Sequence, residues 1–61
     1  IYLNSHPGQE DNMVLKGRML LQINNKELIL EEGDSIYFNS ELPHGMKALD
    51  GEKVSFLAII L

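Results

Sequence analysis

Turn-forming residues divide this chain of 61 residues into short extended segments, and none of the segments keeps a helical spacing of apolar residues. The pairs Asn24-Asn25 and Asp50-Gly51 are typical of tight turns, because these residue types accept the positive φ that such turns require. The second pair also favours a hairpin. Between Gly17 and Asn24-Asn25, the residues Met19, Leu21 and Ile23 share one face of a strand at period two. The sequence therefore predicts an all-β sandwich or barrel.

The end of the chain, Lys53 to Leu61, is apolar on both faces of a strand. A strand of this kind is buried on both faces, either inside a sandwich or against a partner subunit. A chain this short also buries only about 60% of its unfolded surface and is marginal alone. We therefore expect residues 1–61 to be a single domain and a fragment of a longer chain. We expect a partial barrel, or one completed by a homodimer through Lys53 to Leu61 or Ile1 to Leu3.

Composition excludes several kinds of function. The formal net charge is −4, and an acidic surface does not attract phosphate backbones, so this segment is not expected to contact nucleic acid directly. There is no cysteine for a disulfide or a thiolate site. The longest apolar run, Phe56 to Leu61, is too short for a membrane-spanning helix. We expect a cytoplasmic protein that does not associate with a membrane. No nucleophile–base pair and no phosphate-binding loop is visible, so no catalytic residue is assigned.

The only two histidines lie in two separate spaced patterns. His6 precedes Glu10 by four residues, and His44 ends a segment that begins at Gly33. Two imidazoles and a carboxylate suit a divalent transition metal such as Fe, Mn, Ni, Cu or Zn. Three interpretations stay open: a metal site formed by His6, Glu10 and His44, a metal-free polar pocket, and histidines without a role in a site.

These patterns resemble the two motifs of the cupin family of small β-barrels. The first motif, G-x5-H-x-H-x3/4-E-x6-G, is matched by His6, Glu10 and Gly17, with Asn4 at the position of the first histidine. The second, G-x5-P-x-G-x2-H-x3-N, is matched by Gly33 and His44. Its other three positions hold Asn39, Glu41 and Ala48.

The resemblance implies a small jelly-roll-like barrel or sandwich whose interior holds a metal between Asn4, His6, Glu10 and His44. An amide oxygen at Asn4 is a poorer ligand than an imidazole, so the affinity for metal should be reduced. We also expect a pocket for a small molecule that is lined by the two histidines and by Met13, Met46 and Phe56.

The second pattern also resembles the C-terminal sensor domain of bacterial helix-turn-helix regulators of the Xre type. The matching residues are Gly33, Asp34, Tyr37, Phe38, Ser40, Pro43 and His44. This resemblance implies a small-molecule sensor domain of a transcriptional regulator that dimerises and does not catalyse a reaction. The alternatives are a metal-dependent cupin enzyme, either a dioxygenase or an isomerase, and a stand-alone binding protein.

Overall fold

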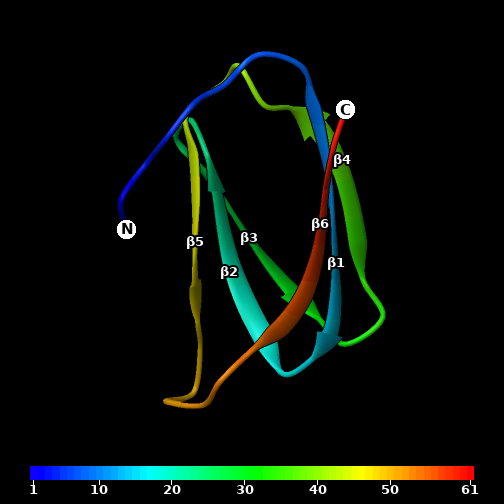
Figure 1. Cartoon of the computed structure of the whole chain (residues 1–61). Helices are drawn as coiled ribbons and strands as arrows, with labels where there is room; N and C mark the ends of the chain where they lie inside the picture. Colours follow the sequence, from blue (N-terminus) through cyan, green and yellow to red (C-terminus); the bar gives the residue numbers. More distant parts are fainter.

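The computed structural model describes all of residues 1–61 and consists of six β-strands without a helix (Figure 1). The strands are β1 (Gln9–Lys16), β2 (Arg18–Ile23), β3 (Lys26–Glu31), β4 (Ser35–Asn39), β5 (His44–Ala48) and β6 (Ser55–Ile60). They form two antiparallel sheets of three strands, in the orders β4-β1-β6 and β3-β2-β5. The predicted all-β fold is confirmed. The structure has no helix with the length and apolar character needed to cross a membrane.

The core lies between the two sheets, which face each other in Figure 1. Its buried apolar side chains come from four strands and are Val14, Met19, Leu21, Leu30 and Phe38. Met19 and Leu21 are fully buried, as the period-two pattern of β2 predicts. Half-buried side chains surround this cluster, namely Ile23, Ile36, Met46, Val54 and Phe56.

The two predicted tight turns connect strands in different ways. Asn24 has a φ of 52°, and the turn Asn24-Asn25 joins β2 and β3 as a hairpin in which Ile23 pairs with Lys26. At Asp50-Gly51 both residues have a positive φ, 61° and 66°. Nevertheless β5 pairs with β2 and β6 pairs with β1, so this turn carries the chain from one sheet to the other. The hairpin expected at Asp50-Gly51 is therefore wrong, because turn residues set a local reversal and not the partner of the strand that follows.

Strand β6 is an edge strand of its sheet, and its apolar residues are exposed on both faces. Leu57 and Ile59 are 48% and 45% exposed on one face, and Ile60 is 62% exposed on the other. The sequence predicted that Lys53 to Leu61 is buried on both faces, and residues 1–61 themselves do not bury these apolar side chains. Residues 1–3 form no strand, and only Asn4 makes an isolated bridge, to His44.

Candidate metal centre

His6, Glu10 and His44 come together from the segment before β1, from β1 and from β5 of the opposite sheet. Glu10 lies in β1, the central strand of its sheet, where it pairs with Phe38 of β4 and Ile60 of β6. His44 is the first residue of β5 in the opposite sheet. The segment before β1 crosses from one sheet to the other, as Figure 1 shows at the N-terminal end of the chain. Each of Asn4 and His44 donates its backbone N–H to the other's carbonyl at 2.8 Å, which fixes this crossing segment against β5.

The turn at Pro7-Gly8 places His6 over Glu10. Gly8 has a φ of 99°, and a Cβ at this position would collide with the carbonyl oxygen of Leu61. A side chain would therefore disfavour both this backbone conformation and the close approach of the chain end. The turn interrupts the strand, so simple alternation along the chain is not what brings His6 and Glu10 together.

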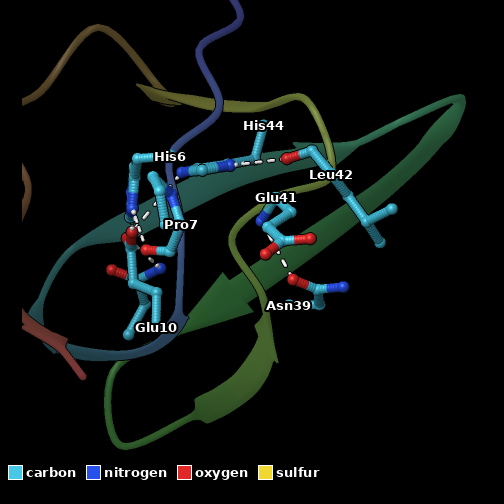
Figure 2. Close-up of polar contacts among 8 residues, drawn as sticks. His6, Pro7, Glu10, Asn39, Glu41, Leu42 and His44 are labelled. Carbon is cyan, nitrogen blue, oxygen red and sulfur yellow. Dashed lines mark hydrogen bonds and ion pairs between the residues drawn. The ribbon is translucent and has the colours of Figure 1, made fainter.

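The three side chains meet at one carboxylate oxygen (Figure 2). Oε1 of Glu10 lies 3.0 Å from Nε2 of His6 and 3.4 Å from Nε2 of His44. The two imidazole rings stand edge to face with their centroids 5.0 Å apart. One ligand atom from each residue lies within 4.8 Å of the other two. Glu10 and His44 are buried, whereas His6 is half-buried and lies at the mouth of the site.

Backbone carbonyls fix the orientation of both imidazole rings. Nδ1 of His44 lies 2.8 Å from the carbonyl oxygen of Leu42, and Nδ1 of His6 lies 3.3 Å from that of Pro7. A carbonyl only accepts hydrogen bonds, so the short contact of His44 assigns the proton of its neutral ring to Nδ1 and the lone pair to Nε2. His6 has an acceptor at each ring nitrogen, because its Nε2 also lies 3.0 Å from Oε1 of Glu10, and its neutral ring can donate to either one. The ring of Phe38 packs on His44 with a centroid separation of 5.0 Å and holds that ring from the side.

This donor set fits a divalent metal ion. Nε2 of each histidine and Oε1 of Glu10 point into one small space, and the repulsion between their lone pairs is offset by a shared cation, either a proton between His6 and Glu10 or a metal ion. Metal-binding histidines characteristically donate the other ring nitrogen to a carbonyl or carboxylate, and Nδ1 of each ring lies within hydrogen-bonding distance of a backbone carbonyl oxygen here. Imidazole and carboxylate together suit transition metals. The residues therefore satisfy the requirements of a three-ligand site.

Asn12 belongs to this arrangement although the sequence analysis did not single it out. It is completely buried, and its Nδ2 donates a hydrogen bond of 3.0 Å to Oε2 of Glu10. The available signal was positional: Asn12 follows Glu10 by two residues and precedes Val14 by two, so all three share the inward face of β1.

The remaining predicted site residues lie in different places. A cavity of about 340 Å³ opens beside the two histidines, and Asn4 and Met46 line it. Phe56 instead packs against the core opposite Val14, and Met13 lies on the outward face of β1 with 40% of its surface exposed. Neither Phe56 nor Met13 borders this cavity. Met13 lies away from the cavity because side chains alternate along a strand, so it points to the face opposite Glu10 and Asn12.

Two antiparallel sheets with a His-His-Glu cluster between them define a small β-barrel-like domain with a candidate metal site. A family model described as "Cupin domain" matches residues 2–60, and the chain belongs to the cupin family. A crystal structure of HppE with Fe(II) and a bound substrate has a TM-score of 0.87 to this chain, with 31% identity. The match covers 97% of this chain and 36% of the HppE chain, so this chain spans about a third of that protein. No curated protein gives a significant match.

Proposed function

We propose that this chain is a metal-binding cupin domain that holds Fe(II) through Nε2 of His6, Oε1 of Glu10 and Nε2 of His44. The observation that carries this proposal is the convergence of these three atoms on one point, with both histidine Nδ1 atoms already engaged by carbonyls. Two histidines and one carboxylate are the ligand set of non-haem Fe(II) sites. The presence of Fe(II) in HppE supports iron as the first metal to test.

The domain would also bind a small molecule next to the metal. Three protein ligand atoms leave positions of a metal ion open to water or to a ligand. The cavity lined by Asn4, His6, His44 and Met46 lies on the side of the site where His6 is partly exposed. Bound Fe(II) would supply redox and Lewis-acid chemistry, while the protein residues hold the ion and shape the space beside it. The role that follows is that of a metal-dependent enzyme domain, which the substrate complex of HppE also supports.

A second candidate is a metal-dependent sensor domain in a helix-turn-helix regulator. The pattern from Gly33 to His44 favours it, because it resembles the sensor domain of Xre-type regulators. In this role, the small molecule would shift the geometry of a homodimer instead of being converted. Both candidates use the same metal site and the same cavity.

The metal site is tested by comparing two adjacent carboxylates of β1. Glu10→Gln keeps the shape of the ligand but removes its charge, whereas Asp11→Asn makes the same change on the opposite face of the strand. The metal-free protein would be titrated anaerobically with Fe(II) in competition with a coloured chelator. We expect Glu10→Gln to weaken binding by more than about a hundredfold, since loss of a ligand should exceed the cost of losing a partner of a ligand. Equal affinities of the two variants would refute the site.

The two roles are separated by one experiment on the full-length protein. Candidate metabolites would be added to the Fe(II)-loaded protein while substrate turnover and DNA affinity are followed together. Turnover without a change in DNA affinity supports the enzyme. A change in DNA affinity without turnover supports the sensor.

A further inference from the structure

Asn12 is buried at a position that an apolar residue would normally occupy. It lies in the central strand of its sheet, between Ile36 of β4 and Ala58 of β6, and its exposed fraction is 0%. Along the same inward face it is followed by Val14, which is 1% exposed and part of the apolar core. A polar amide in such surroundings costs stability unless all its polar atoms find partners.

Only half of the Asn12 amide has a partner. Nδ2 donates to Oε2 of Glu10 at 3.0 Å, whereas Oδ1 is buried without any hydrogen bond. Rotating the amide by 180° would turn its oxygen toward a carboxylate oxygen, and both of these atoms only accept hydrogen bonds. The contact with Glu10 therefore fixes the orientation, and Oδ1 is left unsatisfied as a consequence. With one of its two polar atoms unsatisfied, Asn12 adds little to the stability of the fold. Its one side-chain hydrogen bond, to Glu10, therefore indicates a role in holding that carboxylate.

Because Asn12 donates to Glu10, the two carboxylate oxygens of Glu10 have different partners. Oε2 accepts from Asn12, while Oε1 faces Nε2 of His6 and Nε2 of His44. We propose that Asn12 is a positioning residue that holds Glu10 as a ligand through one oxygen only. This inference rests on the proposed metal site and deepens it. A carboxylate held in this way occupies one position on the metal instead of two, which leaves one more position for water or for the small molecule.

The test uses Asn12→Leu, which has a similar shape and no hydrogen-bond donor. Its matched control is Ser40→Ala, because Ser40 is also 0% exposed and its Oγ also lacks a hydrogen bond. Both variants remove a buried polar atom without a partner, but only Asn12→Leu also takes the donor from Oε2 of the buried Glu10. Ser40→Ala should therefore leave the stability of the metal-free fold nearly unchanged, whereas Asn12→Leu should lower it while the protein stays folded. Three quantities would be measured: urea unfolding of the metal-free protein, affinity for Co²⁺ and Fe(II), and the visible absorption spectrum of the Co²⁺ complex.

We expect Asn12→Leu to weaken metal binding about 10- to 100-fold, which is the usual cost of losing a hydrogen-bonding partner of a ligand. It should also change the Co²⁺ spectrum, because Glu10 becomes free to bind through both oxygens. Ser40→Ala should change neither property. The inference is overturned if Asn12→Leu binds metal as tightly as the unmodified protein with the same spectrum. It is also overturned if Ser40→Ala weakens metal binding as much as Asn12→Leu does, because the loss would then follow from any change to a buried polar residue.

The result for the unmodified protein separates this inference from the proposed function. If the folded, unmodified protein binds neither Co²⁺ nor Fe(II), the metal site itself fails and the role of Asn12 fails with it. If the unmodified protein binds metal and Asn12→Leu binds it equally well, only the role of Asn12 is refuted.

Discussion

The two faces of β1 reverse the usual distribution of polar and apolar residues. On the inward face, Glu10 and Asn12 are 4% and 0% exposed, although one is a carboxylate and the other an amide. On the outward face, Met13 and Leu15 are 40% and 51% exposed, although both are apolar. Burying polar groups costs free energy, so a fold retains them where they have a task. The inward face near Glu10 therefore carries the candidate metal site in place of apolar packing.

The outward face has the character of a contact surface. Met13 pairs with Leu57 of β6, and Asp11 lies between Tyr37 of β4 and Ile59 of β6. These apolar residues of three strands lie on one side of the sheet and are substantially exposed. Exposed apolar patches that extend over several strands are typical of surfaces that other protein segments cover. The predictions below test this contrast between a site face and a contact face.

The largest effect is expected at the buried histidine. His44→Ala should abolish metal binding at micromolar concentrations, because it removes one of three ligands and leaves Glu10 and His6 alone. Isothermal titration of the metal-free variant with Zn²⁺ or Co²⁺ measures this directly. Circular dichroism of the same sample would verify that the β-fold persists. A His44→Ala variant that still binds metal at the level of the unmodified protein would contradict the assignment.

Next in size is the effect of the core on stability. Leu21→Ala should lower the free energy of unfolding by about 2–5 kcal/mol, because Leu21 is fully buried and its removal leaves a cavity. Leu15→Ala on the outward face of β1 should change the free energy of unfolding of the monomer by no more than about 0.5 kcal/mol. Urea denaturation of both variants gives the comparison. Similar losses for the two variants would show that the outward face is already covered in solution.

The incomplete ligand set offers a gain of affinity. Asn4 lines the cavity beside His6 and His44, and the cupin motif has a histidine at its position. Asn4→His should raise the affinity for divalent metal by about tenfold, which corresponds to about 1.4 kcal/mol. Competition with a chelator measures the change. An unchanged affinity would remove Asn4 from the ligand set while leaving the other three ligands in place.

Self-association should depend on the outward face. We predict a dimer, with β6 or residues 1–3 at the interface, since two-fold pairing is the commonest arrangement. Ile59→Lys should raise the dissociation constant of this dimer by at least about tenfold, or about 1.4 kcal/mol. Ile29→Lys is the matched control, because Ile29 is an exposed isoleucine on the other sheet. Sedimentation velocity would decide, and a stable monomer at micromolar concentration would count against the prediction.

The smallest effect concerns a surface ion pair far from the site. Nε and Nη2 of Arg18 donate to the carboxylate of Asp50 at 2.8 and 3.1 Å, and these hydrogen bonds hold the pKa of Asp50 below its usual range. The stabilisation is fully present above the ordinary aspartate pKa of about 3.9 and is lost as the pH falls through the lower folded-state value.

Stability falls as the pH is lowered, and the ion pair accounts for a small part of that fall. Asp50→Asn should remove this part, and so should high salt, which screens the pair. Asparagine accepts the positive φ of this turn, so the substitution isolates the charge. Thermal unfolding between about pH 5 and pH 2.5 measures the difference between the two proteins. Identical pH profiles at low salt would show that the pair contributes nothing.

Local sequence patterns determined the strands, most of the turns and the chemistry of the site. Alternation predicted the buried side chains of β2, and the pair Asn24-Asn25 predicted the tight turn after β2, since both signals act between neighbours in the chain. The motif spacing indicated His6, Glu10 and His44 as a candidate ligand set, and the structure brings one ligand atom of each within 4.8 Å of the others. Residue type alone limited that set to metals that accept imidazole and carboxylate.

Contacts between distant segments decided the rest. Tertiary structure made Asp50-Gly51 a crossover between sheets, because the partner of a strand depends on the packing of both sheets and not on its preceding turn. It also placed Met13 on the outward face of β1 and brought the amide of Asn12 into contact with Glu10. The residue types alone do not reveal either placement. An amide becomes part of a site only through the atom it contacts, and that contact exists only once β1 is buried between the two sheets.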